Sequence, residues 1–316
     1  MPTNSARVRD FAEPLADGGG YWGSFRVGPM ILFLGASGDL GSVAVEELRR
    51  YGHEVIAPTS KELNLTNSVA VQSFCRSLPR SYAVVFAAFV DRRRGETGAE
   101  YEINMRLTEN VMSYTSPDWM VFTSSIVVYG ERPATPITEC STLVDSGLYA
   151  RAKREAEQLV MTASQDKFPT FIARLPGVFG GRSNRNQSLD KILLNGMMSQ
   201  QVALGANGFV RRDWLSAWEV TDFLHHFSAS PLSGLANVVR GDSWTIDDYV
   251  SKALEVVRGV RHDRLEALSQ EDLAHFVFDA SHFRSLFPSW TFPDRERDLH
   301  RLARELSDYC RQTTKP

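Results

Sequence analysis

A tyrosine and a lysine four residues apart, preceded in the chain by a serine at the end of an apolar run, could together transfer a proton. Tyr149 and Lys153 stand in "YARAK", so in a helix they lie on one face about one turn apart. An ammonium held near a phenol lowers the pKa of the phenol from about 10 toward working pH. Ser125 ends the strand-like run 119–125. A strand-end hydroxyl and a helix phenol at the same sheet edge could converge on one carbonyl oxygen.

A glycine-rich stretch, "GASGDLG" at 35–41, follows the apolar run "MILFL" at 30–34 and precedes a segment with helical periodicity. The first glycine permits a tight turn, the second leaves no Cβ between backbone and ligand, and the third lets the helix pack against the sheet. Amides at the start of that helix suit a pyrophosphate. Because a second strand is expected at 54–58, the pattern favours a dinucleotide site over a glycine turn without a ligand. The predicted contacts in this turn are Gly35, Ser37, Gly38, Asp39, Leu40 and Gly41.

Short β-branched or aromatic runs alternate with longer segments of helical period, which indicates a parallel sheet covered by helices. The expected strands are 30–34, 54–58, 82–90, 119–125, 170–180 and 235–241. Right-handed crossovers between them give one doubly wound sheet. We therefore predict an α/β fold of the Rossmann type with a smaller C-terminal substrate domain.

The predicted domain organisation separates a flexible leader at 1–28 from a dinucleotide-binding domain at 29–180, which also receives about 210–241. Polar, glycine-rich stretches after residue 180 assign 181–209 and 242–316 to a substrate-binding domain. The charged tail from about residue 295 has helical periodicity, and we interpret it as a solvated surface helix.

Composition excludes several classes of protein. Of 316 residues, 43% are apolar, which suffices for a buried core, and the net charge of −3 gives no global field that attracts nucleic acid or anionic membranes. No apolar stretch approaches the ~20 residues of a membrane span. Cys75, Cys140 and Cys310 are odd in number and lack metal-ligand spacing. We expect a cytoplasmic protein with reduced thiols, no metal, and neither nucleic acid nor membrane as partner.

The end of the second expected strand, "APTSKELN", bears on the choice of cofactor. Thr59, Ser60 and Lys61 stand where an NAD-binding protein would have an acidic residue for the ribose, and no carboxylate precedes Glu62. Hydroxyls and an ammonium would meet a 2′-phosphate without repulsion. The sequence therefore favours NADP, with NAD as the alternative and an ordinary surface role for Lys61 left open.

The glycine turn, "SSIVVYG" at 124–130 and "YARAK" occur in an order that resembles the extended short-chain dehydrogenase/reductase family, over about residues 29–240. That family contains NAD(P)-dependent nucleotide-sugar epimerases, dehydratases and ketoreductases. The resemblance implies that Tyr149 donates or accepts the proton, Ser125 holds the reacting oxygen, and Lys153 assists the tyrosine and binds the nicotinamide ribose. It further implies that Ser124 helps to position the nicotinamide.

Other stretches resemble the family's cofactor and substrate segments. "RRDWLSAWEVTDF" matches a segment whose arginine, here Arg212, approaches a nucleotide diphosphate; an internal ion pair with Asp213 is the alternative. Asn104 is either a buried structural amide or a catalytic one, and Arg174 is expected to be structural. The remaining cofactor contacts implied by the resemblance are Asn64, Leu65, Ala87, Ala88, Pro176 and Val178.

Two departures from the family's patterns narrow the expected reaction. Dehydratases of the family follow the catalytic hydroxyl with Asp-Glu, whereas Ile126 and Val127 stand here, and Val127 also replaces the cysteine of the fucose-synthase-like enzymes. We predict an NADP-dependent 4-keto reductase of a nucleotide-linked sugar, with a nucleotide-sugar epimerase as the alternative. A reductase of non-nucleotide ketones would not need Arg212. A catalytically silent dinucleotide-binding regulator is the rival of another class, although it would not need the serine, tyrosine and lysine together.

The resemblance also implies a homodimer. Family members commonly pair through a four-helix interface, which here corresponds to the expected helices at about 100–115 and 149–163.

Overall fold

A computed structural model describes residues 29–90, 97–182, 188–263 and 273–313 of the chain. The leader predicted at 1–28 lies outside the described residues.

A six-stranded parallel sheet forms the centre of the molecule, with strand order β10-β5-β4-β3-β1-β2. Its inner strands are buried on both faces, as in other parallel sheets covered by helices. This arrangement confirms the predicted Rossmann-type fold. The strands are β1 (Met30–Leu34), β2 (Val55–Ile56), β3 (Tyr82–Phe86), β4 (Met120–Ser125), β5 (Thr170–Leu175) and β10 (Gly234–Asn237).

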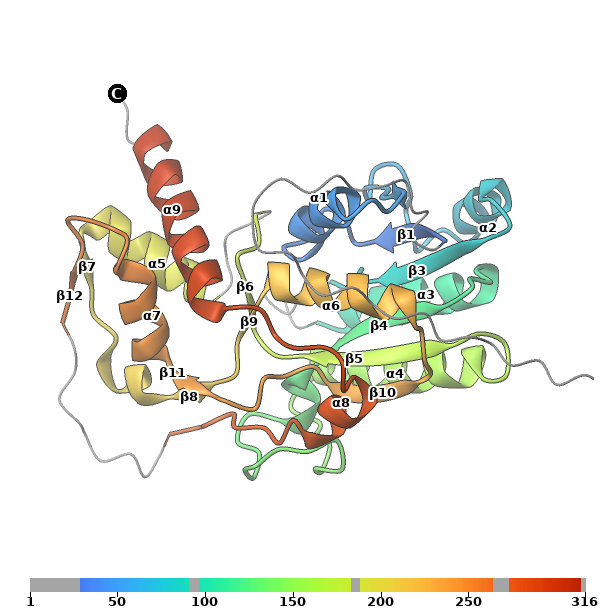
Figure 1. Cartoon of the computed structure of the whole chain (residues 1–316). Coiled ribbons are helices and arrows are strands. Elements are labelled where there is room, and N and C mark those ends of the chain that lie inside the picture. Colours follow the sequence, from blue (N-terminus) through green and yellow to red (C-terminus); the bar gives the residue numbers. More distant parts are fainter. Residues whose placement is uncertain (1–28, 91–96, 183–187, 264–272, 314–316) are drawn as a thin grey trace, which may run out of the picture.

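Helices cover both faces of this sheet (Figure 1). The helices α1 (Gly41–Arg50) and α6 (Ala217–Ala229) lie on one face, and α2 (Ser68–Ser77), α3 (Gly98–Tyr114) and α4 (Leu148–Ser164) lie on the other. Side chains alternate along β1, so that Ile31 and Phe33 join the core under α1 and α6, while Leu32 and Leu34 join the core under α3 and α4. The glycine turn after β1 is therefore anchored from both faces.

Five of the six predicted strands are shorter than expected, and the second and fifth differ for clear structural reasons. The strand expected at 54–58 is reduced to β2, which lies at the edge of the sheet and pairs only with β1 among the described strands. The strand expected at 170–180 divides at Pro176, which has no N–H to donate to a neighbouring strand. The chain resumes as β6 (Val178–Phe179), which pairs in parallel with β9 (Leu215–Ser216).

A second group of helices lies beside the sheet and consists of α5 (Ser188–Ser199), α7 (Ile246–Leu254) and α9 (Arg295–Thr313), which share one apolar core (Figure 1). The short strands β7 (Gln201–Val202) and β12 (Arg261–His262) pair with each other, as do β8 (Arg211–Arg212) and β11 (Trp244–Thr245). The short helix α8 (Ser281–Leu286) packs near β10.

The interpretation of the tail as a solvated helix is wrong for one face of α9. Leu299, Leu302 and Leu306 recur at helical spacing and are at most 1% exposed in the core shared with α5 and α7. Their stripe is hidden in the sequence by the many charged residues between them. The tail therefore completes the second group of helices.

Candidate functional site

The glycine turn between β1 and α1 has a backbone that other residues could not adopt without strain. Gly35 has φ of +103°, and a Cβ there would lie 2.6 Å from the backbone of Ala87. A Cβ on Gly41 would overlap the carbonyl oxygen of Gly35. The third glycine thus allows the helix to pack against the turn itself, and not against the sheet as the pattern suggested. The N–H of Gly38 donates to the carbonyl of Gly35 at 3.0 Å and closes the turn.

The start of α1 has the properties of an anion site. No side chain caps this end of the helix, and its first turn contains no acidic residue. The hydroxyl of Ser42 donates to the backbone carbonyl of Asp39, which fixes the turn, and Ser37 and Gly38 face solvent. Uncapped amides at a helix start favour negative charge. These residues fit the pyrophosphate of a dinucleotide, with Asp39 and Leu40 half-buried at its side.

Helix α3 supports two loops beside the turn. The side-chain amide of Asn104, 1% exposed, donates to the carbonyl of Val90 and accepts from its N–H, at 3.1 and 2.7 Å. These bonds assign Asn104 the structural role. Asn110 donates to the carbonyl of Leu65 at 2.8 Å. The role of Asn110 was not predicted from the sequence, although two asparagines on one predicted helix could have indicated bonds to neighbouring loops.

In the loop after β2, the carboxylate of Glu62 lies against Thr59, at the strand end where the sequence predicted that hydroxyls and an ammonium would meet the ribose. The N–H and the hydroxyl of Thr59 donate to Glu62 at 2.8 and 2.9 Å, and these bonds hold the pKa of Glu62 below its usual value. Ser60 and Lys61 are exposed. The side chain of Asn64 accepts from Thr66 within the same loop. Thr59 is therefore engaged within the protein.

The predicted reaction centre lies where β4 ends and α4 begins. Ser125 is the last residue of β4, and its hydroxyl accepts the N–H of Val127 at 3.3 Å, at the start of the short turn Ile126–Tyr129. Tyr149 is the second residue of α4, and Lys153 follows one turn later. The structure thus places a strand-end hydroxyl, a phenol and an ammonium on two elements that pack against each other.

Lys153 is held in place by the strand and by an aromatic ring. Its ammonium, in a side chain only 4% exposed, donates to the backbone carbonyl of Thr123 at 2.8 Å and lies 3.8 Å from the centre of the Phe89 ring. The same ring meets Tyr149 edge to face at 5.9 Å between centroids. Phe89, which follows β3, was not singled out from the sequence. Its contacts fix the spacing between the phenol and the ammonium.

A buried ion pair lies directly behind the reaction centre. The guanidinium of Arg174 on β5 forms a 2.7 Å ion pair with Glu157 on α4, and each side chain is about 5% exposed. Ser124 also donates to this carboxylate, at 2.5 Å. Its hydroxyl therefore supports the strand end from within, whereas the resemblance implied contact with the nicotinamide. Arg174 has the structural role expected of it.

The network continues toward the sheet edge. Arg174 donates to the hydroxyl of Tyr129 at 2.8 Å, and Tyr129 donates to the side-chain oxygen of Asn237 at 2.7 Å. The chain that carries Ser125 is thus tied to both β5 and β10.

Arg212 on β8 is a partly desolvated cation. It donates to the carbonyl of Ala274 at 2.6 Å and lies 4.8 Å from the centre of the Phe276 ring, and burial lowers its pKa to about 10. Among the described residues no carboxylate pairs with it. Asp213 accepts instead from the backbone N–H groups of Arg240 and Gly241, so the alternative of an Arg212–Asp213 ion pair is wrong. A desolvated guanidinium without a carboxylate suits a phosphate.

The segment after β5 carries the last predicted cofactor contacts. Pro176 is buried and Val178 is half-buried in β6. Between them, the carbonyl of Gly177 accepts the N–H of Leu215 at 3.1 Å, and a Cβ on Gly177 would overlap the ring of Trp214. The backbone of this segment is therefore fixed by close packing.

Comparison with known proteins agrees with this geometry. The model of the NAD dependent epimerase/dehydratase family matches residues 31–239, which include the glycine turn, the serine, the tyrosine and the lysine. The chain belongs to the NAD dependent epimerase/dehydratase family. The resemblance inferred from the motifs is thereby confirmed, and the protein is an NAD(P)-dependent enzyme of this family.

One curated relative is the spore coat polysaccharide biosynthesis protein SpsK of Bacillus subtilis, 28% identical over 173 residues. The match covers 51% of this chain and 58% of that protein. The chain therefore matches little more than half the length of this relative.

Solved structures share the fold of this epimerase/dehydratase chain at low identity. RMD from Pseudomonas aeruginosa, complexed with NADPH, is 16% identical with a TM-score of 0.72, covering 89% of this chain and 98% of that one. The GDP-mannoheptose C4 reductase MlghC from Campylobacter jejuni, with NADP bound, is 18% identical with a TM-score of 0.72, covering 90% and 100%. WbmG of Bordetella bronchiseptica, in complex with NAD and UDP, is 18% identical with a TM-score of 0.71, covering 89% and 96%.

Within its described residues, this family member has neither a metal-binding cluster nor a membrane-spanning helix. Within residues 29–90, 97–182, 188–263 and 273–313, no group of three or more histidine, cysteine or carboxylate side chains is placed to hold a metal ion. Over the same ranges no helix combines the length and the hydrophobicity needed to cross a bilayer. Cys75, Cys140 and Cys310 form no disulfide within the described parts of the chain.

Proposed function

We propose that this enzyme reduces the 4-keto group of a nucleotide-linked sugar with NADPH. The observation that carries the proposal is the placement of Ser125, Tyr149 and Lys153 where β4 meets α4, at the edge of the sheet that also presents the glycine turn. Ligands of open α/β sheets bind at the carboxyl ends of the strands. Tyr149 donates the proton to the carbonyl oxygen, Ser125 holds that oxygen, and Lys153 binds the nicotinamide ribose.

When bound, NADPH would supply a hydride to the carbonyl carbon, and the residues of this chain would hold the substrate and move the proton. The phenol of Tyr149 gives its proton to the oxygen as negative charge develops there, and the ammonium of Lys153 stabilises the phenolate that remains. The product would be the 4-hydroxy sugar. Phe89 contributes by holding the lysine and the tyrosine at a fixed separation.

The two candidate reactions differ in how they use the cofactor, and the expected preference for NADP favours net reduction over epimerisation. A reductase exchanges its cofactor in every cycle and draws on NADPH, whereas an epimerase retains NAD and returns the hydride. Thr59, Ser60 and Lys61 lack the acidic ribose reader at the end of the second strand. Similar folds include RMD, complexed with NADPH, and a GDP-mannoheptose C4 reductase with NADP bound. Retention of Ser125, Tyr149 and Lys153 argues against a silent regulator.

An NAD-dependent epimerase is the second candidate because one contact favours it. Glu62 places a carboxylate at Thr59, at the strand end where an acidic group reads the ribose hydroxyls in NAD-binding proteins. WbmG, complexed with NAD and UDP, provides a similar fold that supports this alternative.

The properties of Arg212 support a substrate that carries a nucleotide diphosphate, which this arginine would bind. Replacement of Arg212 by methionine should weaken the binding of UDP and GDP by about tenfold or more, because a desolvated charge-assisted contact to phosphate is lost. Isothermal titration of both nucleotides against each variant measures this. Arg211→Met is the matched control, since Arg211 is exposed on the same strand and should change affinity less than about twofold. Equal nucleotide affinities in wild type and Arg212→Met would favour a ketone substrate without a nucleotide.

The proposed function assigns the two ligands to different parts of the chain. We assign the sugar and its nucleotide to the side of the molecule formed by α5, α7 and α9, with substrate-binding segments at 181–209 and 242–316. The dinucleotide belongs to 29–180 together with about 210–241. A cytoplasmic location is part of this proposal, and it is consistent with three cysteines that form no disulfide among the described residues.

A homodimer through α3 and α4 is part of the proposal. These two helices pack against each other, and each presents an exposed large apolar side chain, Ile103 on α3 and Met161 on α4.

A further inference from the structure

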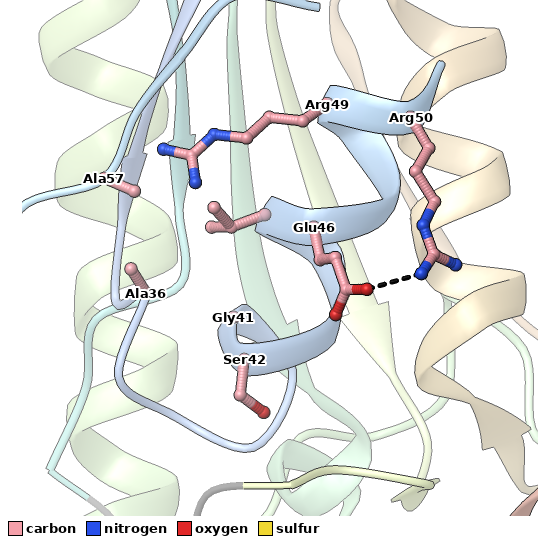
Figure 2. Close-up of a pocket in the computed structure, with 8 residues that line it drawn as sticks. Ala36, Gly41, Ser42, Glu46, Arg49, Arg50 and Ala57 are labelled. Carbon is pink, nitrogen blue, oxygen red and sulfur yellow. Dashed lines mark hydrogen bonds and ion pairs between the residues drawn. The ribbon is translucent and has the colours of Figure 1, made fainter. Parts of the chain in front are cut away.

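A hollow of about 580 Å³ lies beside the glycine turn, between α1 and the chain that follows β2 (Figure 2). Ala36 from the turn and Ala57 after β2 line it, and their small side chains leave the space open. In a dinucleotide bound at such a turn, the adenosine ribose lies between the turn and the end of the second strand. The hollow therefore borders the place where the ribose 2′ position would be.

Arg49 is the cation that reaches into this hollow. Figure 2 shows its side chain extending from the end of α1 toward Ala57. One guanidinium nitrogen donates to the carbonyl of Val55 at 3.0 Å, which directs the group along β2. No carboxylate within the described parts of the chain forms an ion pair with Arg49. Its charge is thus available to a ligand.

The neighbouring arginine has the opposite arrangement. Arg50 points away from Ala36 and Ala57 in Figure 2 and pairs with Glu46 at 2.5 Å and with Glu47 at 3.1 Å. Glu46, the acidic residue that lines the hollow, is itself neutralised by Arg50 and by Arg182 at 2.6 Å. Among the described residues that line the hollow, Arg49 is therefore the one positive group that no carboxylate compensates.

The residues first expected to read the ribose are less suited to a phosphate. Thr59 donates its N–H and its hydroxyl to Glu62, so a 2′-phosphate at this loop would meet a carboxylate. An arginine binds phosphate through two parallel N–H groups, which a lysine cannot do. Arg49 extends from α1, and its printed hydrogen bond is to the backbone of Val55, with no carboxylate of the described residues paired to it.

We propose that Arg49, in the hollow lined by Ala36 and Ala57, binds the 2′-phosphate of NADP and gives the enzyme its preference over NAD. The inference rests on the proposed NADPH-dependent function. Arg49, and not Lys61, is thus the residue that selects NADP over NAD.

The test compares adenosine 2′,5′-bisphosphate with adenosine 5′-monophosphate, which differ only in the 2′-phosphate. Isothermal titration is carried out on wild type, Arg49→Met and Arg50→Met. We expect Arg49→Met to weaken the bisphosphate by about tenfold or more and the monophosphate by less than about twofold, because one charge-assisted phosphate contact is lost. Arg50→Met removes a positive charge one residue away and should change each affinity by less than about twofold, because Arg182 still pairs with Glu46. Arg49→Lys should recover part of the lost affinity.

A parallel titration with NADP and NAD links the result to the whole cofactor. Loss of the NADP preference in Arg49→Met supports the proposal. A similar weakening of both adenosine ligands, or of neither, overturns it, as does a wild type that binds the bisphosphate no more tightly than the monophosphate. No sugar is present in these titrations, so the reductase assignment can fail in turnover assays while the role of Arg49 stands, and the reverse.

Discussion

Replacement of Tyr149 by phenylalanine should lower turnover by about 100-fold or more while dinucleotide affinity changes by less than about twofold. The substitution keeps the ring that meets Phe89 edge to face and removes only the hydroxyl that carries the proton. Steady-state rates with saturating cofactor and a separate cofactor titration measure the two quantities. A large fall in rate with unchanged affinity assigns the residue to chemistry and not to cofactor binding.

Tyr101→Phe is the matched control for this prediction. Tyr101 lies on α3, and its hydroxyl bonds to Glu155 on the outer side of α4, so the same atom is removed from the same helix pair. Its rate should stay within about twofold of wild type, since no reacting atom is lost. Near wild-type turnover in Tyr149→Phe would remove the tyrosine from the proposed mechanism.

Replacement of Arg174 by methionine should cost about 3–5 kcal/mol of unfolding free energy, because the Glu157 carboxylate would remain buried without its cation. Glu157 is 4% exposed and also accepts from Ser124 behind the reaction centre. Urea unfolding followed by circular dichroism measures the loss. Removing both charges in Arg174→Met/Glu157→Leu should recover a large part of it, since no unpaired charge is then buried.

Arg151→Met provides the contrast on the surface. Arg151 pairs with Asp145 through side chains that are 47% and 38% exposed, and breaking such a pair should cost less than about 1 kcal/mol. If Arg174→Met were no more destabilising than Arg151→Met, the buried ion pair would not hold β5 and α4 together.

The fold could be predicted because its strands and helices have local sequence patterns that identify them. The five residues of β1 are apolar and precede glycines whose conformation few other residues adopt, and "YARAK" lies in a helix with an apolar stripe. Parallel pairing then follows from the alternation of strands and helices. Strand lengths were less predictable. β2 is an edge strand with a single partner, and β5 ends before Pro176 because proline has no N–H.

Several contacts around the candidate site could not be predicted from the sequence, because they depend on tertiary structure or on the path of a side chain. Thr59 donates its N–H and its hydroxyl to Glu62 and thereby closes a turn that the sequence does not reveal, so this carboxylate lies closer to the strand end than the sequence suggested. Asn110 supports the loop at Leu65 across 45 positions of sequence. Arg49 and Arg50 are adjacent and identical in type, and only the path of each side chain separates the available cation from the paired one.

The central claim is tested most directly by supplying a 4-keto nucleotide sugar and NADPH and measuring nicotinamide absorbance alongside the sugar product. The account predicts that one NADPH is consumed for each 4-hydroxy sugar formed, and that Tyr149→Phe shows neither change at a comparable rate. Interconversion of two sugar nucleotides with no net change in nicotinamide absorbance would contradict the reductase assignment and establish the epimerase in its place.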